Sequence, residues 1–184
     1  MKRMMVLAVL SAAPVFAAQA EESVAPLPAM NFTSSLAADQ LYGLVKENPA
    51  FGSLEKNLVG SPIQLRITHT LQPTAGGMAT GLLSAIWTGG TLGLLPMVTN
   101  NDLVLHYEVL VNGKSLVSYS FQRNFTRAVN IWKQDDPTYG LGDQGLAWAR
   151  TTATDFAAQA ARSAEMASLA REYAYFFGEA ASKP

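Results

Sequence analysis

The sequence contains no cysteine, only two histidines and few charged residues, and these shortages exclude several classes of protein. Without cysteine there is no disulfide framework, no cysteine-ligated zinc site, no thiol nucleophile and no acylated cysteine anchor. The 13 Lys and Arg residues nearly balance the 14 Asp and Glu residues, so the chain has no basic footprint for nucleic acid. Yet 49% of its 184 residues are hydrophobic, which excludes a disordered chain and supports one domain with a sizeable core.

The N-terminus has the three-part layout of a secretory signal peptide. Met1-Lys2-Arg3 is a basic start, residues 4–17 form an uncharged apolar run, and Ala18-Gln19-Ala20 offers small residues for cleavage. The apolar run is too short to span a bilayer comfortably, although a retained N-terminal anchor is the alternative. We therefore predict a signal peptide at residues 1–20 and an exported mature protein.

The remaining chain alternates between helical and strand patterns. Residues 21–33 carry two prolines and little periodicity and are predicted to be a linker, and residues 179–184 a tail. Ser34 or Ser35 can cap a short helix, which should end near Asn48 because Pro49 follows. Apolar and polar residues alternate with a period of two at residues 63–71, 103–111 and 117–125, which predicts three strands.

The connection between the last two predicted strands can be judged from the faces that it aligns. Asn112-Gly113 favours a two-residue hairpin loop. That register would place Tyr107 opposite Ser118, so the apolar side of one strand would meet the polar side of the other. A three-residue loop at 111–113 pairs Tyr107 with Val117 and aligns the apolar sides. We therefore predict the three-residue loop, with a bulge.

The C-terminal part is rich in alanine and lacks proline from residue 143 to residue 177, which predicts a long helix that Thr151-Thr152 can interrupt. Its expected apolar face consists of Phe156, Ala160, Ala164, Ala167, Ala170, Ala174 and Phe177. The domain, residues 34–178, is then predicted to be of the α+β class. A small antiparallel sheet of three or four strands should carry a short N-terminal and a long C-terminal helix on one face.

One stretch does not fit this pattern. No Asp, Glu, Lys or Arg occurs from Ile67 to Asn101. Residues 79–98 have the length of a membrane-spanning helix, but Gly89-Gly90 and Pro96 make a lone spanning helix poor. The insertion at residues 76–98 either folds over the sheet as core or contacts a membrane or a partner chain, with an interfacial tryptophan. The predicted contact residues are Leu82, Leu83, Ile86, Trp87, Leu92, Leu94 and Leu95.

The same stretch carries a resemblance. Thr91 to Pro96 reads TLGLLP, and it is followed by a strand, a turn, a strand and Trp132. This arrangement resembles small uncharacterised envelope proteins and lipoproteins of Gram-negative bacteria. The resemblance implies a location in the periplasm or at the outer membrane, and it brings no catalytic residue. Many members of that group are acylated on cysteine, an anchor that this chain cannot share.

The residues available for chemistry form no recognised set. Residues 140–145 read GLGDQG, but no strand leads directly into them and no second strand follows the helix, as a dinucleotide site requires. A turn with Asp143 capping the helix is expected instead. His69 should lie on the apolar face of its strand. His106 and Glu108 offer two metal ligands without a visible third, so neither a metal nor a cofactor is predicted.

Arg123 and Arg127 interrupt the apolar side of the third strand. They either mark the end of a strand that leaves the core or form a patch that contacts anions or lipid headgroups. Together these features predict a non-enzymatic, exported envelope protein that contacts a membrane or partner chains through residues 76–98. A periplasmic carrier that holds an apolar ligand between sheet and long helix is the alternative, and a hydrolase of unknown substrate is a second one. No nucleic-acid partner is expected, and a homo-oligomer remains open.

Overall fold

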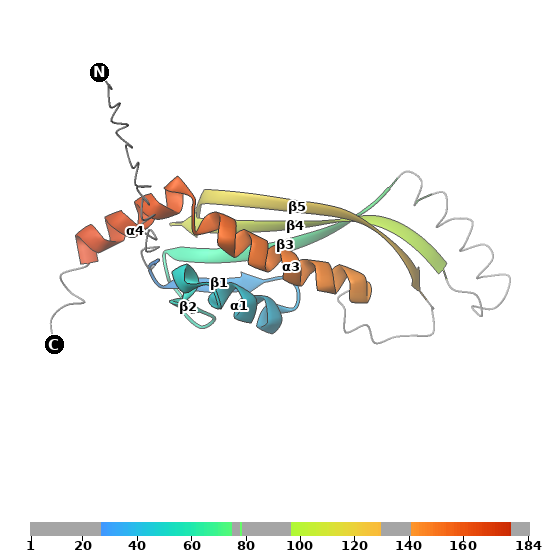
Figure 1. The fold of residues 1–184 in the computed structure, drawn as a ribbon, viewed down its shortest axis with the longest axis horizontal. Coiled ribbons are helices and arrows are strands. Elements are labelled where there is room, and N and C mark those ends of the chain that lie inside the picture. The colour runs from blue at the N-terminus through green and yellow to red at the C-terminus, as the bar shows by residue number, and fades with distance from the viewer. Residues whose placement is uncertain (1–26, 75–77, 79–96, 130–140, 178–184) are drawn as a thin grey trace, which may run out of the picture.

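One mixed sheet with helices packed on one of its faces forms the protein (Figure 1). The computed structural model describes residues 27–74, 78, 97–129 and 141–177, with the backbone alone for 97–99 and 127–129. The strands are β1 (Met30–Ser34), β2 (Leu54–Glu55), β3 (Ile63–Pro73), β4 (Met97–Val111) and β5 (Lys114–Val129). The helices are α1 (Ala38–Lys46), a 3-10 turn (Pro49–Phe51), α3 (Gly142–Ala160) and α4 (Ala164–Phe177). The predicted α+β class is confirmed.

The sheet has five strands, not the three or four expected, in the order β2-β1-β3-β4-β5. The additional strands are β1 and β2, and β1 pairs parallel with both β2 and β3. Residues 30–33 were predicted to be part of a linker, which is wrong, because Met30 and Phe32 are buried in the core. With only two inward side chains, β1 is too short for period-two alternation to reveal it.

The β4–β5 hairpin corrects the predicted loop and keeps the predicted alignment of faces. Asn112 and Gly113 form a two-residue loop, and both have positive φ (52° and 75°), as a type I′ turn requires. Leu116 is the additional residue of a β-bulge, since Leu110 faces Ser115 and Val109 faces Val117. The bulge, not the loop length, brings the apolar sides together. As a result Tyr107 faces Tyr119 instead of the predicted Val117.

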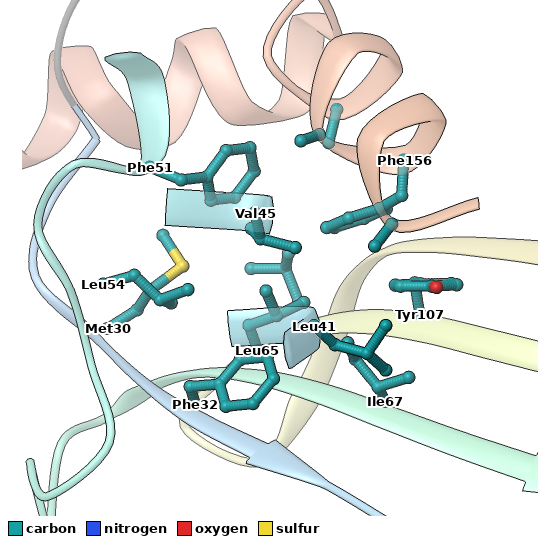
Figure 2. Close-up of a cluster of buried hydrophobic side chains, with 14 of the residues drawn as sticks. Met30, Phe32, Leu41, Val45, Phe51, Leu54, Leu65, Ile67, Tyr107 and Phe156 are labelled. Carbon is teal, nitrogen blue, oxygen red and sulfur yellow. The ribbon is translucent and has the colours of Figure 1, made fainter. Parts of the chain in front are cut away.

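The core lies between the sheet and the helices α1 and α3 (Figure 2). We call this side of the sheet the helix-side face and the opposite side the outer face. Leu41 and Val45 of α1 and Phe156 of α3 are fully buried against Leu65 and Tyr107 of the sheet. The rings of Tyr107 and Phe156 stack with their centroids 4.8 Å apart. The close contact follows from α3's composition, because buried alanines flank Phe156 and let the helix approach the sheet.

The predicted long C-terminal helix is two helices. α3 runs through Thr151-Thr152 without interruption and ends at Ala160, and α4 begins at Ala164. The break occurs where the Ser163 Oγ accepts a hydrogen bond from the backbone N–H of Met166, the geometry of a helix N-cap. The break changes which residues face the protein. Met166 and Ala170 of α4 are buried, while Ala164, Ala167 and Ala174 of the predicted apolar face are exposed.

Candidate functional site

The uncharged insertion, residues 76–98, connects β3 to β4 at one end of the sheet. β3 ends at Pro73, which pairs with Asn101 of β4, and both the backbone N–H and the hydroxyl of Thr74 bond to the Asn100 carbonyl at 3.3 Å. We call this region, residues 70–74, 97–103 and 123–129, the far end of the sheet, and the region around the Asn112-Gly113 loop the turn end. Figure 1 shows the far end on the opposite side of the molecule from α4.

The predicted contact residues themselves, Leu82, Leu83, Ile86, Trp87, Leu92, Leu94 and Leu95, lie outside the described residues. Met97 and Val98, which were expected in the insertion, belong to β4 and pair with Val129 and Ala128. Met78 is the described residue between Thr74 and Met97. Its backbone N–H donates to the Thr74 carbonyl at 2.8 Å and its side chain is 55% exposed.

The helix-side face changes in character toward the far end. At the turn end, Leu65 and Val109 face each other and both are fully buried. At the far end, Leu71 faces Leu103, and Leu71 is 37% exposed. Apolar side chains therefore continue along β3 beyond the part of the face that the helices cover.

Arg123 lies on the helix-side face of the edge strand β5. It faces Leu103, it is exposed, and its guanidinium carbon lies 5.5 Å from the ring centroid of Phe125. Phe125 in turn packs on Trp148 of α3, with 5.6 Å between centroids. Arg127 faces Thr99, and only its backbone is described. Arg123 thus covers an aromatic ring with its charge in solvent, and an inward-pointing charge on an edge strand also discourages pairing with other chains.

The outer face carries mostly polar side chains. Arg66 donates to Glu108 at 3.0 Å, and His106 lies between Thr68 and Ser120. Glu108 is therefore engaged by an arginine next to the histidine with which it was considered as a metal ligand. No group of three or more His, Asp or Glu side chains suited to a metal ion occurs among the described residues.

His69 makes a contact that the sequence pattern did not indicate. Its Nδ1 forms a hydrogen bond with the Ser35 hydroxyl at 2.7 Å, and its backbone N–H donates to the Ser35 Oγ at 3.1 Å. Burial lowers the pKa of His69, which favours the neutral imidazole. Within the described chain no carboxylate hydrogen-bonds to this imidazole, so the third member of a catalytic triad is missing there.

Ser34 or Ser35 was expected to cap the first helix, and this interpretation is wrong. The N-cap of α1 is Ala37, in left-handed geometry at φ 38°, without a side-chain cap. Ser35 instead attaches the segment between β1 and α1 to strand β3, since its backbone N–H also donates to the Ile67 carbonyl at 3.0 Å. The Ser35–His69 hydrogen bonds therefore have a structural role, because they hold the segment between β1 and α1 against β3.

Tyr107 and Thr152 form the buried polar contact of the core. The Tyr107 hydroxyl lies 2.9 Å from the Thr152 Oγ1, and the Thr152 hydroxyl donates to the Ala149 carbonyl at 2.9 Å. Burial raises the pKa of Tyr107 to about 12. Both hydroxyls are satisfied by the protein, so this pair stabilises the packing of α3 on β4 without leaving a group free for catalysis.

The glycine pattern at residues 140–145 has a packing role where the structure describes it. α3 begins at Gly142, and Asp143 lies in its first turn, where a negative charge is favourable, but no side chain caps the helix. The expected cap by Asp143 is therefore wrong. A Cβ on Gly145 would lie 3.0 Å from the Leu141 Cβ, so this glycine leaves room for the Leu141 side chain at the start of α3, whereas the 3.7 Å to Leu103 of the sheet would be an ordinary van der Waals contact.

None of the described helices is both long and apolar enough to cross a membrane. No protein-family model and no curated protein matches the chain. Among solved structures it is similar to a minor lipoprotein from Acinetobacter baumannii, with 13% identity and a TM-score of 0.33 over 76% of this chain and 93% of that one. It is also similar to the rare lipoprotein B from Shewanella oneidensis, with 17% identity and a TM-score of 0.28 over 81% of this chain and 98% of that one.

Proposed function

We propose that this chain is an exported, non-enzymatic protein of the cell envelope that contacts a membrane or a partner chain through residues 76–98. The observation that carries the proposal is the charge-free run from Ile67 to Asn101, which contains residues 76–98. The strands on either side of residues 76–98 pair with each other at the far end of the sheet, where Pro73 faces Asn101. A connection of this length between two adjacent antiparallel strands is far longer than a hairpin needs. Long insertions of this kind are usually functional.

The composition of the described sheet supports contact outside the fold. The outer face presents Arg66, Thr68, Ser118 and Ser120, which are exposed and polar, although Val104 and Leu110 are buried there. The helix-side face is filled at the turn end by α1 and α3. A run of large apolar residues gains little by covering a polar face, whereas a lipid or protein surface would remove it from water.

Export rests on residues 1–20, whose basic start, apolar run and small-residue site have the layout of a signal peptide. The non-enzymatic assignment is supported by the pairing of the reactive groups that are described. His69 is bonded to Ser35, Glu108 to Arg66, and Tyr107 to Thr152. Each of these polar groups has a structural partner that accounts for its position.

The alternative, a carrier for an apolar ligand between sheet and α3, is not favoured by the packing. Ala149, Ala153 and Phe156 are fully buried against the sheet, and the stacked rings of Tyr107 and Phe156 occupy the middle of that interface. A ligand there would have to displace an aromatic stack.

The test introduces a charge into residues 76–98 and measures how the protein is distributed between the membrane fraction and the soluble fraction. Trp87→Asp and Leu94→Asp should each shift the expressed protein from the membrane fraction to the soluble fraction, because a buried carboxylate in lipid or in an apolar interface is costly. Val59→Asp is the matched control, since Val59 is 92% exposed and lies outside the insertion. A wild-type protein that stays in the aqueous fraction, does not bind liposomes and sediments as a monomer contradicts the proposal.

A further inference from the structure

The end of α4 exposes a cluster of aromatic side chains. Seven large hydrophobic side chains of the described residues are exposed, and four of them lie within the last five residues of this helix. The exposed fractions of the four are 41% for Tyr173, 82% for Tyr175, 71% for Phe176 and 55% for Phe177. We call these four residues the aromatic tip.

The aromatic tip continues a face that is buried earlier in the same helix. At about 3.6 residues per turn, Tyr173 and Phe177 follow Met166 and Ala170 on one side of α4. Met166 and Ala170 pack on the domain with exposed fractions of 0% and 6%. Figure 1 shows α4 running past the end of the strands, so the second half of this face has no sheet beneath it.

The rings of the tip contact one another. Tyr173 and Phe177 have centroids 4.9 Å apart, and Tyr175 and Phe176 have centroids 5.0 Å apart in an edge-to-face arrangement. Tyr175 points to the other side of the helix from Tyr173 and Phe177, which follows from its position in the helical repeat. Aromatic side chains therefore surround the end of the helix on more than one side.

The geometry favours a lipid surface over a protein partner. A protein groove covers one side of a helix, whereas a helix end that enters a lipid interface buries all of its sides. Taking roughly 200 Å² for a buried aromatic side chain, the exposed fractions correspond to about 500 Å². A stable protein interface needs about 800 Å² from each partner, so the tip alone is too small for a dimer.

The chemistry of the tip fits the boundary between lipid headgroups and acyl chains. Phe176 and Phe177 are wholly apolar, while the hydroxyls of Tyr173 and Tyr175 can remain hydrated at the level of the headgroups. Residues 173–177 carry no charge, and Arg171 and Glu172 precede them with opposite signs. We propose that the aromatic tip of α4 inserts into a phospholipid surface and forms a membrane contact separate from residues 76–98.

The test uses the absence of cysteine from the chain. Tyr175→Cys and Val59→Cys each give one labelling site for an environment-sensitive fluorophore, and both positions are highly exposed. The protein starting at Glu21 is mixed with vesicles of phosphatidylethanolamine and phosphatidylglycerol. The label at position 175 should shift its emission to the blue, and the label at position 59 should not.

The double variant Phe176→Ser, Phe177→Ser should weaken vesicle binding at least about tenfold, because two exposed phenyl rings lose their burial in lipid. Its unfolding midpoint should match that of the wild type, since neither ring belongs to the core. Val59→Ser, the same kind of change at another exposed apolar residue, should leave vesicle binding unaltered.

The outcomes separate this inference from the proposed function. If Trp87→Asp abolishes vesicle binding while the double variant binds like the wild type, the insertion is the membrane contact and the inference about α4 is overturned. If the double variant abolishes binding and Trp87→Asp does not, the inference holds and lipid contact by the insertion fails. A dimer that the double variant dissociates, without any shift on vesicles, would show that the tip binds a second copy of the chain and would also overturn the inference.

Discussion

At the turn end of the sheet the apolar side chains of β3 lie under helices, whereas at the far end Leu71 of the same strand meets solvent, although its neighbour Leu103 on β4 is buried. Ile67 of β3 is fully buried beside Tyr107, whereas Leu71, two helix-side positions further along the same strand, is 37% exposed. Both Ile67 and Leu71 fit the same period-two pattern of apolar residues. The comparison teaches that alternation identifies the face of a strand and does not tell whether anything covers that face.

The difference arises from the unequal rise of strands and helices. β4 has 15 residues, which span about 50 Å at the rise of a strand. α3 has 19 residues, which span only about 29 Å at the rise of a helix. α3 therefore cannot cover the full length of β4 and β5, and the strands extend beyond it toward the point where the uncharged insertion departs (Figure 1).

The largest expected contrast between the two ends concerns deletion of an apolar side chain. Phe156→Ala should lower the free energy of unfolding by about 3–5 kcal/mol, because it removes a ring stacked on Tyr107 and leaves a cavity. Leu71→Ala should lower it by less than about 1 kcal/mol, since the side chain is partly hydrated already. Urea denaturation of both variants measures the two effects. Equal losses would mean that the far end is covered as well as the turn end.

The second contrast concerns the buried hydroxyl pair of the turn end. Thr152→Val should lower the free energy of unfolding by about 1–3 kcal/mol, because the Tyr107 hydroxyl keeps only a 3.4 Å contact with the Ala149 carbonyl. Thr151→Val, an exposed neighbour in the same helix, is the matched control and should change stability little. If both variants unfold at the same denaturant concentration as the wild type, the hydroxyl pair does not contribute to stability.

Tyr107 also makes the turn end sensitive to alkaline pH. Its pKa is raised from 10.0 to about 12, chiefly by burial, so the folded state resists ionisation that the unfolded state accepts. The free energy of unfolding should therefore fall as the pH rises from about 10 toward about 12. Ultraviolet titration of tyrosinate should show one late-ionising tyrosine, which Tyr107→Phe removes. Titration of every tyrosine near its ordinary pKa would contradict this prediction.

The smallest effect on the free energy of unfolding is expected at His69, which lies between the turn end and the far end of the sheet. Burial lowers its pKa below 6.5, so the unfolded chain takes up a proton before the folded one does as the pH falls. The free energy of unfolding should be constant above about pH 6.5 and decline below it. Ser35→Ala removes the hydroxyl that is hydrogen-bonded to Nδ1 and should lower the free energy of unfolding by about 0.5 kcal/mol at neutral pH.

The accompanying measurement is an NMR titration of the His69 ring. Ser35→Ala should leave the pKa of His69 below its usual value, because burial is the cause of the shift. A His69 pKa that returns to its ordinary value in this variant would contradict burial as the cause of the shift.

Long periodic elements could be predicted from the sequence, and short or interrupted ones could not. β3 and β4 were expected because each alternates over many residues, and α1 ends at Lys46, close to the predicted end near Asn48. β1 and β2 were missed because five and two residues are too few to show a period. The break after α3 was missed because Ser163 reads as one polar residue among alanines until its side chain is seen to cap α4.

The candidate site was less predictable than the fold. Its starting point, the absence of charge from Ile67 to Asn101, is visible in the sequence, and so are Arg123 and Arg127. The exposed aromatic tip of α4 was not recognised, because Phe177 was counted on a continuous buried helix face. Only the break at residues 161–163 and the finite length of the sheet make these rings solvent-exposed.

Composition and local pattern alone therefore determined the class of the fold, the inward side of each long strand and the position of the uncharged insertion. These are local properties, because side-chain direction and helix periodicity depend on a few consecutive residues. The tertiary structure decided the strand order, the position of the bulge, the partners of Ser35 and Thr152, and which apolar side chains remain uncovered. Those outcomes depend on contacts between residues far apart in the chain and on the unequal lengths of packed elements, which no local pattern contains.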